Sequence, residues 1–183
     1  SSAARTEAKT ETLTIGVSSL QESYVDPNWA VGGLIFPLQW AIADFLYFPD
    51  QEGKFQPTLA TGYTLSDDKL RWTFKLRPGQ KFHDGQPVTA KDVVASILRF
   101  SKRIPAGVTM MQFTKEIVAT GPETFEIRLN KPFGLVLETL AGPENPLFIT
   151  READALGDPN AAITTAVGSG PFIFVREAWV PGS

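Results

Sequence analysis

The sequence predicts an α/β fold of mixed α+β type, because strand-like and helix-like patterns follow one another along the chain. The clearest strand pattern is the strict alternation of apolar and polar residues over residues 70–77. The clearest helix pattern is an apolar stripe over residues 90–102. Of the 183 residues, 43% are apolar and 20% are charged, which is typical of a globular domain and excludes a disordered chain.

The N-terminal part of the chain predicts a leader, a strand and a helix. Residues 1–12 are small, polar and charged, so we expect a flexible leader rather than a signal peptide. Apolar and small polar residues alternate in residues 13–17, which predicts a strand. Within residues 29–48 apolar residues recur at helical spacing, and we expect a helix with Pro37 in its first turn. Residues 49–57 are expected to form a loop.

Residues 70–77 predict a half-exposed antiparallel strand with one apolar and one polar face. Pro78 and Gly79 are expected to close this strand, because glycine supplies the positive φ that a type II turn needs. The two faces give a specific expectation: Trp72, Phe74 and Leu76 are buried, whereas Arg71 and Lys75 are exposed.

A helix is predicted to follow over residues 90–102. Thr89 is its expected N-cap, and Asp92 is the expected partner in a capping box. Pro105 and Gly107 are expected to end it. The apolar stripe consists of Val93, Val94, Ile97 and Leu98.

The remaining elements are shorter. Residues 115–119 and 124–129 flank a Gly-Pro turn and predict a hairpin. Residues 133–140 predict a short helix, and Thr150 is expected to cap another one. Residues 172–175 are apolar on both faces, which predicts a buried central strand.

The composition excludes several functional classes. The chain has no cysteine, so thiol catalysis and cysteine-ligated metals are excluded, and its single histidine, His83, excludes a histidine-rich metal site. The net charge of −3 argues against nucleic acid as a partner. No apolar stretch is long enough for a membrane span. We expect no metal and no cofactor.

Two short motifs could suggest catalysis, and both have simpler interpretations. His83 and Asp84 could form an acid–base pair, but an Asp-Gly pair is already explained as a turn. We therefore expect His83 to lie in a turn away from any cleft. Ser169 lies between two glycines, but a nucleophile elbow needs a helix after it, and here Pro171 and a strand-like run follow.

The four tryptophans divide into two groups. Trp72 lies on the apolar face of the predicted strand and is expected in the core. Trp29 and Trp40 flank a Gly-Gly break near the loop after the first strand, so we expect at least one of them to line a pocket.

A more specific pattern runs through residues 57–100. The strand reads WTF and then LR, residues 81–85 read KFHDG, residues 87–90 read PVTA, and the helix carries Ser96 and Arg99. This order of motifs resembles the signature of the family 5 extracellular solute-binding proteins, the dipeptide-, oligopeptide- and nickel-binding group of ABC importers. Further matches at Asp26-Pro27, at residues 126–129 and at residues 168–172 extend the resemblance over most of the chain.

The resemblance implies a periplasmic binding protein type II-like fold, in which two lobes close on a solute. This chain would cover lobe I with the extra family 5 subdomain, and lobe II would be absent. Residues 13–48 and 168–183 would then belong to the core of lobe I. Residues 49–167 would form the inserted α+β subdomain.

The resemblance also implies a function: an extracytoplasmic solute-binding subunit of an ABC importer rather than an enzyme. Such a protein captures a peptide or another small solute in the cleft between its lobes and delivers it to the permease. It works in the periplasm or elsewhere outside the cytoplasm. The positions in this sequence that the resemblance places near the cleft are Ser18, Ser19, Trp29, Trp40, Met110 and Asn145.

Two other classes of function stay open at this point. One is a hydrolase or other enzyme that reuses this fold, and the other is an interaction domain without a small-molecule site. If the chain is one lobe of a clamp, it should fold but bind solute weakly, because half of the site is missing. It would also expose an apolar surface through which it can self-associate.

Overall fold

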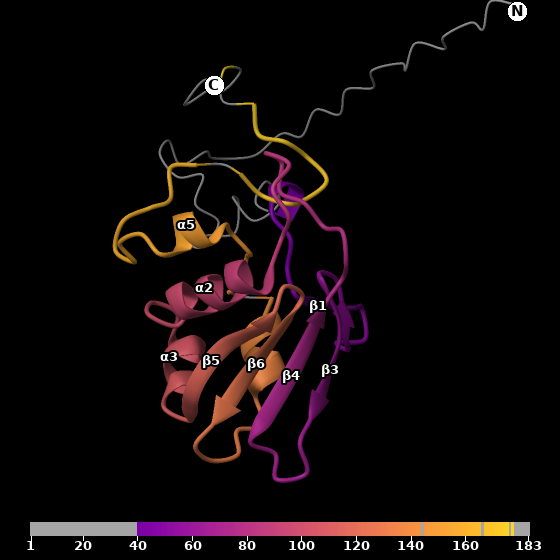
Figure 1. The fold of residues 1–183 in the computed structure, drawn as a ribbon, viewed down its shortest axis with the longest axis vertical. Helices are drawn as coiled ribbons and strands as arrows, with labels where there is room; N and C mark the ends of the chain where they lie inside the picture. The colour runs from indigo at the N-terminus through magenta and orange to yellow at the C-terminus, as the bar shows by residue number, and fades with distance from the viewer. Residues whose placement is uncertain (1–39, 144, 166, 176, 178–183) are drawn as a thin grey trace, which may run out of the picture.

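The computed structural model describes residues 40–143, 145–165, 167–175 and 177 (Figure 1). Within these residues an antiparallel sheet is covered on one face by helices. The elements in chain order are β1 (Tyr47–Pro49), β2 (Phe55–Pro57), β3 (Ala60–Leu65), β4 (Arg71–Leu76), α2 (Ala90–Phe100), α3 (Pro105–Met111), β5 (Thr114–Gly121), β6 (Thr124–Leu129), α4 (Val136–Ala141) and α5 (Glu152–Ala155). The predicted leader and first strand lie outside the described residues.

The main sheet has four strands in the order β3-β4-β6-β5, and all neighbours are antiparallel. The pairing of β4 with β6 sets Trp72 opposite Ile127 and Phe74 opposite Phe125, so the apolar side chains of both strands share one face. The rings of Phe74 and Phe125 stack with their centroids 4.8 Å apart. This confirms the predicted burial of Trp72, Phe74 and Leu76.

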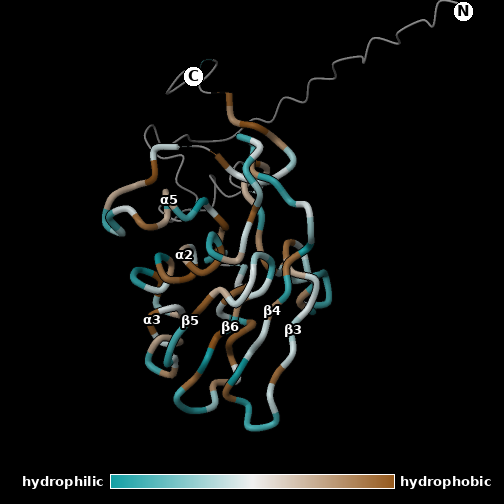
Figure 2. Tube along the Cα trace, viewed as in Figure 1, coloured by the Kyte–Doolittle hydropathy of each residue, from teal (hydrophilic) through white to brown (hydrophobic). Residues whose placement is uncertain are grey.

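The opposite face of the sheet is polar. Arg71 and Lys75 are exposed, as predicted. Arg128 on β6 forms ion pairs with Glu116 on β5 and Glu126 on its own strand, each at 2.7 Å. Brown and teal residues therefore alternate along the strands in Figure 2, since only one face of the sheet is covered.

Helix α2 covers the apolar face of the sheet beside β5 and β6 (Figure 1). Its N-terminus has the predicted capping interaction. The Thr89 backbone N–H and hydroxyl donate to the Asp92 carboxylate at 2.8 and 2.7 Å. Val93 and Ile97 are fully buried. The stripe read from the sequence is therefore the face that packs on the sheet.

Helix α2 ends at Phe100, before Pro105, as predicted, although two residues earlier than expected, and the sequence did not predict the helix that follows. Pro105 begins helix α3, where it occupies the first turn. A proline is tolerated there because its missing N–H has no partner inside the helix. Gly107 lies within α3, and a Cβ at this position would be 2.7 Å from the Ser101 Cα. This glycine thus permits the close approach of α3 to the end of α2.

The segment predicted as a loop over residues 49–57 contains a small hairpin. Strand β1 pairs with β2, and Tyr47 lies opposite Pro57. The Asp50 carboxylate accepts hydrogen bonds from the backbone N–H groups of Glu52 and Lys54, both at 2.9 Å, which closes the turn. The strands are only three residues long, too short to show an alternation in sequence. The preceding helix also ends earlier than predicted, since only residues 40–42 of its described part are helical.

The C-terminal half departs from prediction in three places. Helix α4 begins at Val136 rather than at residue 133. The N-cap of α5 is Arg151, whereas Thr150 is buried and bonded through its backbone N–H to the Ser96 hydroxyl at 3.0 Å. Residues 172–175 form no strand: the exposed fractions of Phe172 and Ile173 are 63% and 66%. Figure 2 shows this apolar segment in brown near the C-terminal end, away from the sheet.

A buried arginine organises the long connection after α5. Arg99 on α2 is 4% exposed. Its guanidinium donates hydrogen bonds to the backbone carbonyls of Asp158, at 3.0 Å, and of Ala161. Because a buried guanidinium needs acceptors for its N–H groups, these contacts hold the loop against α2. The predicted division into lobe I (13–48 and 168–183) and inserted subdomain (49–167) stays a prediction.

Candidate functional site

Of the six predicted site residues, Trp40, Met110 and Asn145 lie in the described part of the chain. Ser18, Ser19 and Trp29 lie outside the described residues. Met110 lies on the buried side of α3 and is fully enclosed in the core, so it has no surface to offer to a solute in this chain. Trp40 and Asn145 are exposed.

Trp40, the first of the helical residues 40–42, is part of an aromatic cluster with residues that follow this helical turn. Its ring packs edge-on against Phe45 and Phe48, with centroids 6.3 and 5.3 Å apart. Phe45 in turn packs against the buried Phe148, at 4.9 Å. These contacts fix the indole from one side while 38% of Trp40 stays exposed. A large aromatic surface held in this way can stack on a solute.

The loop that carries Asn145 leads directly into this cluster. Phe148 forms an antiparallel bridge with Phe45, and the Ile149 N–H donates to the Asp44 carbonyl at 3.0 Å. Asn145 lies three residues before Phe148 in the chain and is exposed, whereas Met110 is enclosed in the core. The grouping of Trp40 and Asn145 in one solute site stays a prediction.

Two glycines pass very close to the segment that follows Trp40. The Gly170 N–H donates to the Ile42 carbonyl at 2.8 Å, and the Phe172 N–H donates to the Ala41 carbonyl at 2.9 Å. A Cβ on Gly168 would lie 2.0 Å from the Ile42 carbonyl oxygen, and one on Gly170 would lie 2.7 Å from that of Ala41. Only glycine allows this approach, so the Gly-Ser-Gly sequence has a structural reason.

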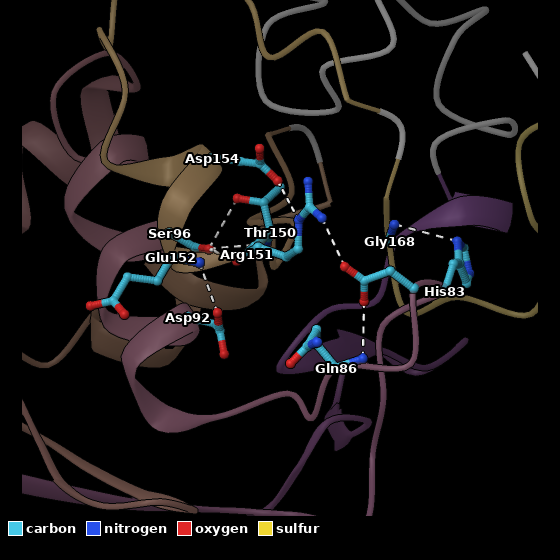
Figure 3. Close-up of polar contacts among 10 residues, drawn as sticks. His83, Gln86, Asp92, Ser96, Thr150, Arg151, Glu152, Asp154 and Gly168 are labelled. Atoms are coloured by element: carbon cyan, nitrogen blue, oxygen red, sulfur yellow. Dashed lines mark hydrogen bonds and ion pairs between the residues drawn. The ribbon is translucent and has the colours of Figure 1, made fainter.

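His83 contacts the same two glycines. We call the place where residues 168–172 pass the backbone of residues 41–42 the glycine junction. Its backbone N–H donates to the Gly168 carbonyl at 2.8 Å, and its ring Nε2 lies 2.8 Å from the Gly170 carbonyl. The Gly168 N–H donates to ring Nδ1 at 3.4 Å (Figure 3). Because a carbonyl can only accept, ring Nε2 carries a proton and donates to the Gly170 carbonyl, while ring Nδ1 accepts from the Gly168 N–H. His83 lies in a turn, as predicted, but that turn contacts a distant segment.

Asp44 lies beside this junction. Burial raises the pKa of its carboxyl group above the ordinary value of 3.8, and the neighbouring Ser169, His83 and Arg77 side chains oppose that rise. Asp44 had not stood out in the sequence, because a single acidic residue in a hydrophobic run gives no indication of which distant segments will surround it.

A second polar group ties the His83 turn to α5. The Arg151 guanidinium bridges Asp84, at 2.8 Å, and Asp154, at 2.7 Å (Figure 3). The Gln86 N–H and then the Arg151 guanidinium hold the pKa of Asp84 below its ordinary value of 3.8. On α2, the second oxygen of Asp92 accepts the Glu152 N–H at 2.7 Å. The His83 turn is thus fixed to α5, and α5 is fixed to α2.

The described contacts at this junction join backbone segments and do not assemble a serine–histidine catalytic pair. Both ring nitrogens of His83 are engaged with backbone groups of Gly168 and Gly170, so neither can take a proton from Ser169. Within the described ranges, no group of three or more acidic or histidine side chains could hold a metal ion. No helix among those residues is long and apolar enough to cross a membrane.

Comparison with known proteins identifies the family. The model of the bacterial extracellular solute-binding proteins, family 5 Middle, matches residues 54–183. The chain belongs to this family. A protein of Sinorhizobium fredii named "Probable peptide ABC transporter periplasmic-binding protein y4tO" is 38% identical to this family 5 chain over 161 residues, which are 88% of the chain and 30% of the relative. The glutathione-binding protein GsiB of Escherichia coli K12 is 34% identical over 131 residues, 69% of this chain and 25% of GsiB.

Solved structures of binding proteins share the fold of this family 5 chain. The binding protein AgaA in complex with agropinic acid, from Agrobacterium tumefaciens R10, superimposes with a TM-score of 0.70 at 32% identity, covering 88% of this chain and 32% of AgaA. MoaA in complex with mannopinic acid, from the same source, gives a TM-score of 0.67 at 28% identity over 82% of this chain and 32% of MoaA. The chain thus spans about a third of the length of these relatives.

Proposed function

We propose that this chain is part of an extracytoplasmic solute-binding subunit of an ABC importer, and that it supplies one side of the solute site. The observation that carries this proposal is the family match over residues 54–183, supported by 38% identity to a periplasmic-binding relative over 88% of the chain. The partner would be the importer's permease. The site of action would be the periplasm or the outer face of the cytoplasmic membrane.

The proposed solute is a peptide or another small polar molecule. Relatives are named for binding peptides and glutathione, and a solved relative is in complex with agropinic acid. On this chain, Trp40 offers a rigid aromatic face, and Asn145 offers an amide that can both donate and accept hydrogen bonds. Ser18, Ser19 and Trp29 complete the proposed half-site. Met110 is left out because it is enclosed in the core.

An enzymatic role is disfavoured. In the Ser–His pair considered from the sequence, Ser169 with His83, the imidazole has no free ring nitrogen for proton transfer. The family consists of solute-binding proteins. We therefore propose that the protein binds its solute without changing it, and that closure of a second lobe supplies the remaining contacts.

The proposal is tested by titration calorimetry of the full-length protein with di- and tripeptides, glutathione and agropinic acid. We expect one of these probes to bind and to be recovered unchanged. The Trp40→Ala variant should bind that probe at least tenfold more weakly, since it loses an aromatic contact.

The matched control is Tyr63→Ala. Tyr63 is exposed to a similar extent, 42% against 38% for Trp40, but it lies on β3 of the sheet. The Tyr63→Ala variant should bind the probe with the same affinity as the unaltered protein. Chemical conversion of the probe, or equal losses in the two variants, would count against the proposed function.

A further inference from the structure

We propose that His83 is a positioning residue for the solute site: its imidazole locks residues 168–170 against the segment that carries Trp40. This inference rests on the proposed function, because it concerns the residues that we place beside the solute. It assigns a role to a turn residue that the sequence alone explained only as part of a turn.

The geometry of the imidazole is the first step. His83 uses its backbone N–H, its Nε2–H and its Nδ1 lone pair on the two glycines, at 2.8, 2.8 and 3.4 Å. The ring holds its donor and its acceptor in one rigid plane. Neither Asn nor Gln can put one group at each of the two ring-nitrogen positions, and Phe has the ring shape without either group. Histidine is therefore the residue type that satisfies both contacts together.

The second step leads from His83 to Trp40. The segment that His83 holds donates from Gly170 to the Ile42 carbonyl and from Phe172 to the Ala41 carbonyl. Ala41 follows Trp40 directly. A Cβ at either glycine would collide with this backbone, so the two segments are in close contact. A shift of the glycines would therefore move the backbone next to Trp40 and change the position of its indole.

The third step is the exposure of the apolar side chains that end the segment. Phe172, Ile173 and Val175 are all more than half exposed, so their burial adds little to holding it. Gly168 is buried where it passes the Ile42 backbone. Among the described contacts, hydrogen bonds and the close approach of the glycine backbone therefore hold residues 168–172, rather than the burial of apolar side chains.

The last step is the rigidity of the turn itself. Asp84 accepts from the Gln86 N–H at 3.0 Å and from Arg151 at 2.8 Å, and Gly85 supplies a φ of 85°. Phe82 beside it is buried in the core. The imidazole therefore projects from a fixed base, and this makes it suited to set the position of a more weakly held segment.

The test uses His83→Phe, His83→Gln and the control Gln86→Ala in the full-length protein. Gln86 lies in the same loop, and its side chain is exposed while its backbone N–H is kept. Hydrogen exchange at the Gly170 and Phe172 amides reports on the junction, calorimetry with the probe that binds reports on the site, and urea unfolding reports on stability.

We expect His83→Phe to speed exchange at both amides at least tenfold and to weaken binding at least tenfold, with exchange in β4 and β6 unchanged. His83→Gln, which keeps one donor, should lie between Phe and the unaltered protein. Gln86→Ala should change neither readout. Because Phe preserves the ring volume, a purely packing role would leave exchange and affinity unaltered in His83→Phe, and that result would overturn the proposal.

Two outcomes separate this inference from the proposed function. If the unaltered protein binds none of the probes, the proposed function fails, and with it the role of His83 at a solute site. Exchange would then still measure whether the junction depends on His83. If a probe binds, and exchange quickens in His83→Phe while its affinity stays within threefold, the junction is real but the positioning role is wrong.

Discussion

The sheet and the glycine junction are held together in different ways. In the sheet, Phe74, Phe125 and Ile127 have no exposed surface, and their strands pair along their full length. At the junction, residues 168–171 carry no large apolar side chain and Phe172 is mostly exposed, and backbone hydrogen bonds and one imidazole hold them in place. The stability of the sheet therefore depends on the packing of buried side chains, whereas the position of the junction depends on a few hydrogen bonds.

This difference predicts different responses to mutation. Loss of volume in the sheet should lower the stability of the whole domain, because a cavity is left behind in a close-packed core. A change at the junction should shift residues 168–172 more than it lowers the unfolding free energy of the fold.

The largest loss is expected from Phe74→Ala. Phe74 is fully buried and stacks on Phe125, so its removal should cost about 3–5 kcal/mol of unfolding free energy. Urea unfolding followed by tryptophan fluorescence measures this cost. A loss below about 1 kcal/mol would mean that the core collapses around the gap and that this face of the sheet does not carry the stability.

Gly170→Ala should have a smaller global effect and a larger local one. The added Cβ would lie within 2.6 Å of the Ile42 carbonyl carbon, so we expect a loss of about 1–3 kcal/mol and rapid exchange of the Phe172 amide. Gly134→Ala is the matched control, because a Cβ there has no neighbour within 4 Å. Equal responses of the two variants would show that the close approach at Gly170 does not constrain the chain.

The smallest effects are expected from two aspartates of opposite character. The pKa of Asp84 is lowered in the folded state, so its carboxylate stabilises the fold above the ordinary value of 3.8, and this contribution is lost as the pH falls through the folded pKa. The pKa of Asp44 is raised, mainly by burial, so its ionisation costs stability as the pH rises above 3.8.

Asparagine variants test whether each ionised carboxylate stabilises or destabilises the fold. At neutral pH, Asp84→Asn should unfold at a lower urea concentration than the unaltered protein, and Asp44→Asn at a higher one. Both differences should shrink at about pH 3, where the aspartates of the unfolded chain are protonated. Shifts of the same sign at neutral pH would contradict the environments described for these two carboxyl groups.

The sequence predicted three strands of the main sheet but neither β3 nor the junction, and the reason is physical. The alternation around Trp72 and Phe74 is local, so the buried face could be read from neighbouring residues. The capping of α2 by Thr89 and Asp92 is equally local. The contacts of His83 with Gly168 and Gly170 span more than eighty residues, and no local pattern announces them.

The candidate site shows the same limit. Trp40 could be proposed from its place near a Gly-Gly break, and the structure leaves it exposed on an aromatic support. Met110 was proposed from the family resemblance alone, and its place on the buried side of α3, a helix that the sequence did not predict, puts it in the core. Arg99 belongs to a recognisable motif, but its loop-holding contacts required the fold.

We propose that Trp40, Asn145 and the other half-site residues of this chain form one side of a solute site, and that a second lobe supplies the other side. Calorimetry with the same probe on the 183-residue chain and on the full-length protein measures how much of the site lies in this chain. Solute sites usually enclose about 70–90% of the ligand surface, and one lobe offers about half of that, so we predict binding at least about a hundredfold weaker for the chain alone. Equal affinities would place the whole site within this chain and would contradict the two-lobed account.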